Sequence, residues 1–232
     1  METAFAQQPI ILASGSPRRQ ESFRLLGLPF ICFPANVDET PPPDMSPRHV
    51  AEHLAVRKVM AVADKLGMRN KELETEDCIS LVDQVTAHGL QTTAQFLSPH
   101  SSFLIFGADT IVVLENEIFG KPLNRSEAGK MLNRLAGCRH EVITAMALHN
   151  RETGKTDSRS ASCEVFFGPL AEAEIEWYLN TGEWEGAAGA YRLQERGACL
   201  ISSINGSPGA VVGLPLRDFF VMLKDNGYQC GA

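Results

Sequence analysis

The most constraining feature of the sequence is a short apolar run that leads directly into a helix start. Residues 9–13 form the apolar run, and the small residues 14–16 follow it. An apolar run of this length predicts a buried strand. Ser16 can cap a helix, and Pro17 suits the first helical position because the missing N–H has no partner to lose there. With Gly27 ending the helix, this strand–loop–helix unit predicts an α/β protein.

The rest of the chain alternates between strand and helix patterns, without an internal repeat. Further strands are predicted at 30–33, 103–106, 111–114, 141–148, 160–167, 198–204 and 210–212. Helices are predicted at 47–66, 125–135, 170–180 and 215–226. Turns are expected at 115–117 and 153–154, where the polar and glycine-containing stretches lie. The alternation again favours an α/β fold, which we expect to form one domain over 1–232.

The segment 69–102 differs from the rest of the chain. It begins with an acidic stretch and continues with Thr, Gln, Ser and His, with little hydrophobic periodicity. We interpret it as an insertion or long loop, in which a short helix at 79–85 is one option.

Composition limits the classes of partner. The chain has 21 basic and 28 acidic residues, a formal net charge of −7 at pH 7. A net anion is repelled by nucleic acid and by anionic membranes, so neither is expected as a partner. No apolar run reaches the ~18 residues of a membrane helix, and the six cysteines are scattered without a C-x-x-C pair. We therefore expect a protein of a reducing compartment, most simply the cytoplasm.

The loop at 14–16 is a candidate phosphate site. Free backbone N–H groups and the positive end of a helix dipole favour an anion there. Arg18 and Arg19, in the first turn, can add charge-assisted hydrogen bonds. The alternative is an ordinary capped helix with two solvated arginines, and the residues alone do not separate the two interpretations.

Two other clusters contain groups suited to catalysis. Asp109 follows an apolar strand between small neighbours, where it can bind a divalent ion, activate water or simply form a turn. Lys121 stands between Gly120 and Pro122, which suits a preorganised phosphate contact but not a Walker A loop.

Two further patterns concern base recognition and metal binding. Gln194 could read a base edge, and Tyr191 could pack on one. His49 and His53 match a short zinc-hydrolase pattern, which remains an alternative, whereas His140 is expected to be structural.

Taken together and in order, these motifs resemble the Maf family of nucleoside triphosphate pyrophosphatases. The matching positions are 12–21, Asp38-Glu39, Lys58, 107–110, 120–122, 135–137, 140–142, 189–191 with Gln194, and 212–216. The resemblance implies an elongated, mixed, twisted sheet with flanking helices and two lobes around a central cleft, similar to inosine triphosphate pyrophosphatases. It also implies hydrolysis to a nucleoside monophosphate and pyrophosphate, a divalent metal (Mg²⁺, with Mn²⁺ or Co²⁺ as options) and a homodimer.

The resemblance also assigns roles by position. Asp109 matches the proton acceptor, and the phosphate and metal positions are Ser14, Arg19, Glu39, Lys58 and Lys121, with Asp109 and Glu39 as metal ligands. Arg18, Thr110 and Gln194 match positions that set base preference, in the form typical of the branch acting on dTTP and UTP. The alternatives are the branch acting on 7-methyl-GTP and a regulator of cell division with little catalysis.

Two departures from the family pattern concern the base site. Arg192-Leu193-Gln194-Glu195 replaces the usual Gly-Ile-Gln-Gly, and Ala187 replaces a usual lysine. Both lie in the segment that carries Gln194.

Overall fold

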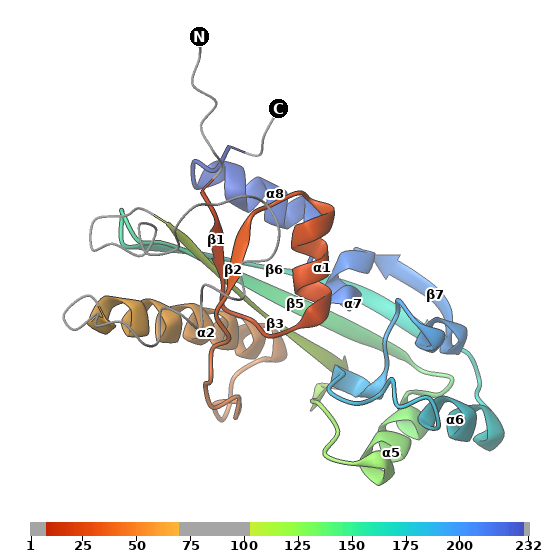
Figure 1. The fold of residues 1–232 in the computed structure, drawn as a ribbon. Coiled ribbons are helices and arrows are strands. Elements are labelled where there is room, and N and C mark those ends of the chain that lie inside the picture. The colour runs from red at the N-terminus through yellow and green to blue at the C-terminus, as the bar shows by residue number, and fades with distance from the viewer. Residues whose placement is uncertain (1–7, 70–102, 230–232) are drawn as a thin grey trace.

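The computed structural model describes residues 8–69 and 103–229 (Figure 1). The strands are β1 (Ile10–Leu12), β2 (Phe30–Cys32), β3 (Leu104–Leu114), β4 (Glu117–Phe119), β5 (Arg139–Asn150), β6 (Lys155–Phe167) and β7 (Ile201–Gly206). The α-helices are α1 (Pro17–Leu25), α2 (Pro47–Arg69), α5 (Arg125–Leu135), α6 (Glu172–Leu179), α7 (Pro208–Val212) and α8 (Leu216–Asp225). Two 3₁₀ turns are η1 (Ala188–Ala190) and η2 (Arg196–Leu200). None of the helices in these described ranges is both long and apolar enough to cross a membrane.

One mixed sheet joins all the described strands. Its order is β2-β1-β3-β5-β6-β7, and β4 pairs with the far half of β3. β1 runs parallel to both β2 and β3, whereas the pairs β3–β4, β3–β5, β5–β6 and β6–β7 are antiparallel. Figure 1 shows the long strands β3, β5 and β6 running through the whole molecule, with helices on both sides. The predicted α/β class and mixed sheet are confirmed.

Side chains of β3 alternate between the two faces of the sheet. Ile105, Ile111 and Val113 pack in the cluster that includes α2. The opposite face carries two separate apolar clusters, one beneath α1 and α8 and the other beneath α5 and α6. Thr110 of β3 and the buried Thr144 of β5 lie directly opposite each other in register, between these two clusters. A polar strip therefore divides this face into two lobes.

Asp109 lies in the middle of a strand rather than beyond the end of one. The prediction of two strands separated by 107–110 is wrong, because β3 is continuous from Leu104 to Leu114. Gly107 resembles a break in the sequence, but it serves close packing: a Cβ there would lie 2.8 Å from Cγ2 of Val59 on α2. A glycine within a strand often marks such a close approach.

Other elements differ in type or length from the prediction. The strand expected at 210–212 is the short helix α7, which begins with Pro208 and ends at Gly213, where φ is 100°. These are the residue preferences of a helix start and a left-handed helix end, and they override the strand propensity of Val211 and Val212. Helix α2 continues through Gly67 to Arg69, and the region 196–200 is η2 rather than strand.

Several predictions agree closely with the structure. α1 ends before Gly27, Asn124 caps α5 through its side chain, and the turn at 115–117 uses positive φ at Glu115 and Asn116. The short helix considered at 79–85 and nearly all of the segment 69–102 lie outside the described residues.

We predict that Gly107→Ala lowers the free energy of unfolding by about 1–3 kcal/mol, because the added methyl group would force α2 away from β3. Urea unfolding with an unchanged m-value is the measurement. Gly67→Ala, at an exposed position of α2 with nothing within 4 Å of its Cβ, is the control. It should be neutral or stabilise by up to about 1 kcal/mol. Equal effects of the two substitutions would contradict the packing argument.

Candidate active site

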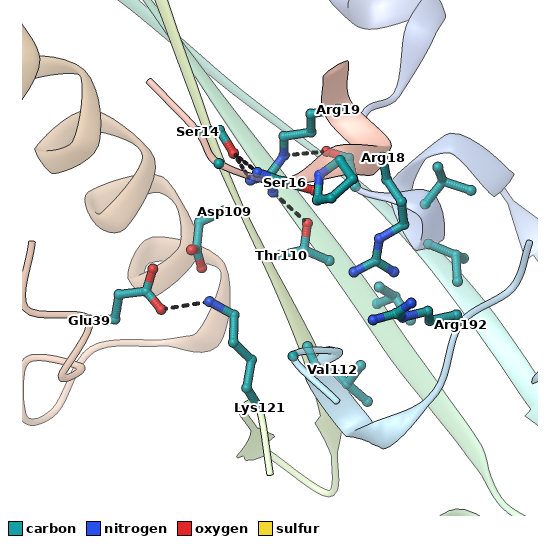
Figure 2. Close-up of a pocket in the computed structure, with 18 of the residues that line it drawn as sticks. Ser14, Ser16, Arg18, Arg19, Glu39, Asp109, Thr110, Val112, Lys121 and Arg192 are labelled. Carbon is teal, nitrogen blue, oxygen red and sulfur yellow. Dashed lines mark hydrogen bonds and ion pairs between the residues drawn. The ribbon is translucent and has the colours of Figure 1, made fainter. Parts of the chain in front are cut away.

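The cavity opens at a gap along one edge of β3. β1 pairs with β3 as far as Phe106, and β4 begins to pair at Val112. Among the described strands, none covers residues 107–111 on this edge. Side chains from both faces of β3 therefore reach one cavity, of about 500 Å³. Figure 2 shows Asp109 and Thr110 entering it from the same strand.

The start of α1 forms one wall of the cavity. Ser16 occupies the N-cap position, as predicted, but its side chain makes no capping hydrogen bond. Its backbone N–H instead points to Oγ of Ser14 at 3.3 Å. The wall thus presents a helix N-terminus without a side-chain cap, which is the environment that favours an oxyanion.

Arg19 ties this wall to the rest of the site. Its Nε donates to the carbonyl of Gly213 at 3.0 Å, and its two Nη groups donate to Oγ of Ser14 and Oγ1 of Thr110, both at 3.1 Å. Thr110 Oγ1 lies 2.8 Å from Oγ1 of Thr144, which donates to the carbonyl of Ala210. Burial lowers the pKa of Arg19 to about 10, so it stays a cation at neutral pH. Arg19 therefore spans the polar strip between the two lobes.

Opposite charges alternate along the other side of the cavity. Lys58 Nζ lies 2.5 Å from Oδ1 of Asp109 and 2.7 Å from Oε1 of Glu39. Lys121 Nζ lies 3.1 Å from the second oxygen of Glu39. Burial alone would raise the pKa of Glu39, but the hydrogen bonds and charges of Lys58 and Lys121 lower it to about 2. Glu39 is consequently ionised at any pH at which the protein is expected to work.

The end of the cavity away from Asp109 is lined by a different set of side chains. Its apolar members include Val112, Val142, Ala188 and Val211. Arg18 and Arg192 add charge there (Figure 2), and Glu195 pairs with Arg192 in the same lining. The apolar side chains are thus concentrated at one end of the cavity, where charged groups accompany them, and such a cavity suits an amphipathic ligand with an anionic part.

Tyr191 and His140 form a buried pair beneath this end. Nε2 of His140 lies 2.9 Å from Oη of Tyr191, and both side chains are at most 4% exposed. Burial lowers the pKa of His140 to about 4 and raises that of Tyr191. His140 is thus neutral and structural at pH 7, as predicted, and Tyr191 is buried too deeply to present a broad stacking face.

The cavity brings together all the predicted site residues except Gln194. It is lined by Ser14, Arg18, Arg19, Glu39, Lys58, Asp109, Thr110 and Lys121. Gln194 is exposed and outside the lining, and so are His49 and His53. Sequence analysis missed Arg192 and Glu195, although the departure from the family pattern at 192–195 was a usable signal.

The charge in the cavity differs in sign from that of the chain. Its lining holds five Lys or Arg side chains and four Asp or Glu side chains, whereas the whole chain carries −7. Asp109 and Glu39 each place a carboxylate oxygen beside Nζ of Lys58, and carboxylate oxygen is the donor type that Mg²⁺ prefers. Within the described residues no three His, Cys, Asp or Glu side chains form a metal-binding group. That donor set fits a cation that takes its remaining ligands from water and substrate.

Comparisons with known proteins identify the family of the chain. The family model of the Maf-like protein matches residues 9–226. The chain belongs to the Maf-like protein family. A dTTP/UTP pyrophosphatase of Pelotomaculum thermopropionicum is 39% identical over 95% of this chain and 97% of its own length. Those of Symbiobacterium thermophilum and Neisseria gonorrhoeae are 38% and 34% identical, each over 95% of both chains. The solved structure of the Staphylococcus aureus Ham1 protein aligns with a TM-score of 0.39 at 12% identity, over 68% of this chain and 71% of that one.

We predict that Arg19→Lys lowers the free energy of unfolding by about 2 kcal/mol or more, because one ammonium group cannot replace three directed hydrogen bonds in a buried site. Arg24→Lys on the same helix is the control, since Arg24 is exposed and its hydrogen bonds to Glu21 and Gln20 lie at the surface. It should cost less than about 0.5 kcal/mol. Denaturant unfolding of both variants measures the difference, and equal losses would rule out the bridging role of Arg19.

Burial of His140 predicts a loss of stability in mild acid. The unfolded chain takes up a proton near pH 6.5, whereas the folded protein does so only near pH 4. Stability therefore falls as the pH drops from about 6.5 to about 4, by up to about 3 kcal/mol, and this contribution is constant below that range.

The measurement is the free energy of unfolding of His140→Gln and the unsubstituted protein between pH 7.5 and 4.5. The variant should lose most of the slope, while His149, whose pKa burial also lowers, contributes equally to both proteins. His53→Gln, at an exposed position, should keep the slope. An unchanged slope in His140→Gln would refute the assignment.

Proposed function

We propose that the protein is a nucleoside triphosphate pyrophosphatase that hydrolyses dTTP and UTP to the monophosphate and pyrophosphate. The observation that supports this most directly is the concentration of cations against two carboxylates in one cavity beside the start of α1. A triphosphate needs this combination of positive charge and oriented donors. The relatives named dTTP/UTP pyrophosphatases support the same activity and the same pair of bases.

In this proposal Ser14, Arg19 and the first-turn N–H groups bind phosphate oxygens. Lys58 and Lys121 neutralise charge on the pyrophosphate leaving group. Asp109 orients or deprotonates the attacking water as the α–β phosphoanhydride bond breaks. Its placement within a long strand holds the carboxylate rigidly, which suits a group that must direct water toward phosphorus.

The proposal includes a divalent cation, Mg²⁺ by preference and Mn²⁺ or Co²⁺ as substitutes, with Asp109 and Glu39 as its ligands. When bound, the cation neutralises phosphate charge and polarises the phosphoryl group. We also propose a homodimer located in the cytoplasm, with a role in clearing or balancing nucleotide pools and without a nucleic-acid partner.

A panel of canonical and modified triphosphates, with pyrophosphate and orthophosphate measured separately, tests the activity. Pyrophosphate from dTTP and UTP is expected, with a loss of turnover in EDTA and recovery with Mg²⁺ alone. Orthophosphate as the only inorganic product, or no product from any triphosphate, would overturn the proposal. A requirement for Zn²⁺ would favour the histidine pair His49 and His53.

Asp109→Asn should lower kcat for UTP on the order of 10²–10⁴-fold, the usual contribution of a general base. Binding of UTP, measured by calorimetry with the variant, should persist because Lys58 keeps its contact with Glu39. Asp218→Asn, at an exposed position on α8, is the matched control and should retain normal turnover. An active Asp109→Asn enzyme would exclude Asp109 as the water-directing group.

A further inference from the structure

Two guanidinium groups lie close together at the end of the cavity away from Asp109. Figure 2 shows Arg18 of α1 and Arg192 of the segment after η1 facing the same space. Burial and the charge of Arg192 both lower the pKa of Arg18. Among the described residues the Arg18 guanidinium has no hydrogen-bond or ion-pair partner. Burying a cation beside another cation is unfavourable unless hydrogen-bond acceptors or negative charges compensate, so a ligand with acceptor groups would be stabilised here.

Arg192 is held rigidly by its own segment. One Nη donates to the carbonyl of Glu185 at 2.6 Å, and the other lies 3.4 Å from Oε1 of Glu195. A Cβ on Gly197 would lie 2.3 Å from the carbonyl oxygen of Arg192, so the backbone is closely packed there. Nε of Arg192 is buried and has no hydrogen-bond partner. The buried Nε cannot reach a ligand, but each Nη keeps a second N–H donor on a side chain that is positioned in advance.

These side chains supply donors and an acceptor at one end of a partly apolar cavity. Arg18 and Arg192 are donors only, and the Glu195 carboxylate is an acceptor only. Resting on the function proposed above, the geometry points to Arg18, Glu195 and Arg192 as the set that reads the imide edge of uracil or thymine. The guanidinium groups donate to the C2 and C4 carbonyls, and Glu195 accepts the N3–H between them. Val112 and Val211 line the same cavity as apolar surface for the ring.

The donor and acceptor pattern explains discrimination against the other pyrimidine. Uracil and thymine present acceptor, donor, acceptor along this edge, which matches donor, acceptor, donor. Cytosine has an unprotonated N3 and an amino group at C4, so it would place an acceptor against Glu195 and a donor against a guanidinium. A site built for a hydrogen-bonded group rejects an analogue that leaves its polar groups unpaired.

Arg18, Glu195 and Arg192 take the base-reading role that the family pattern gives to Gln194. Gln194 and Glu195 are both exposed, but Arg192 and Glu195 line the cavity and Gln194 does not. Both are departures from the family's usual glycines. Base recognition in this chain is therefore assigned to the residues on either side of Gln194, with Gln194 as the competing assignment.

The test compares binding of UMP and CMP by calorimetry, without turnover. In Glu195→Gln the amide can present oxygen to N3–H or nitrogen to the cytosine N3, so it tolerates both bases. The ratio of the UMP and CMP affinities should fall at least about tenfold, mainly through tighter CMP binding. The ratio of kcat/KM for UTP and CTP should fall in parallel. Gln194→Ala should leave both ratios nearly unchanged.

Glu152→Gln, an exposed carboxylate in the turn between β5 and β6, controls for the change of charge and should behave as the unsubstituted protein. An unchanged ratio in Glu195→Gln, or a fall seen only in Gln194→Ala, would overturn the inference. Pyrophosphate release from UTP would persist in that case, so the proposed function would stand. Absence of pyrophosphate release from the unsubstituted protein would instead refute the function, while the UMP and CMP titrations would still decide how the base is read.

Discussion

The site depends on the buried guanidinium of Arg19. It bonds three segments that are distant in sequence: the loop after β1, the middle of β3 and the turn after α7. They meet at the boundary between two apolar clusters, where Leu12 and Leu214 belong to one cluster and Val211 to the other. The long strands β3 and β5 already join the two lobes beneath the polar strip of Thr110 and Thr144. The directed hydrogen bonds of one planar cation add a link from the start of α1 to the turn after α7, and they fix the cavity wall that is proposed to face phosphate.

The same cation helps to reconcile an anionic chain with an anionic ligand. A negative net charge repels polyanions at long range, but the effect is screened beyond about 10 Å at ordinary salt. Inside the cavity, the positions of the nearby charged side chains determine whether an anion binds. Lys58 is shared by Asp109 and Glu39, so neither carboxylate faces the space alone. Arrival of a metal-bound phosphate would exchange these internal pairs for new ones, with less electrostatic cost than burying an unpaired charge.

The class of the fold and most of the charged residues that line the cavity are predictable from the sequence, and the errors have physical reasons. The strand–loop–helix unit, Asn124 as a cap and the turn at 115–117 depend on local residue preferences, so they were predictable. Gly107 resembles a strand break in the sequence, but it permits the close approach of Val59 from a helix more than forty residues away. Such a tertiary contact cannot be predicted from local residue preferences. The family motif predicts Gln194 as the base-site residue of this segment, so it does not predict Arg192 and Glu195. These two residues line the cavity and Gln194 does not.

The alternation of side chains along β3 places Asp109 and Thr110 in different surroundings. Successive residues of a strand point to opposite faces, so Asp109 joins Lys58 on the α2 side while Thr110 joins Arg19 on the other. Both reach one cavity only because β1 stops and β4 has not yet begun along that edge. The carboxylate proposed as the water-directing group is thereby tied to a rigid strand and a long helix. The side chains proposed to read the base lie outside the sheet, on α1 and on the segment after η1. If both proposals hold, substitutions at 192 and 195 would alter the choice of base while Asp109 and Lys58 stay in place.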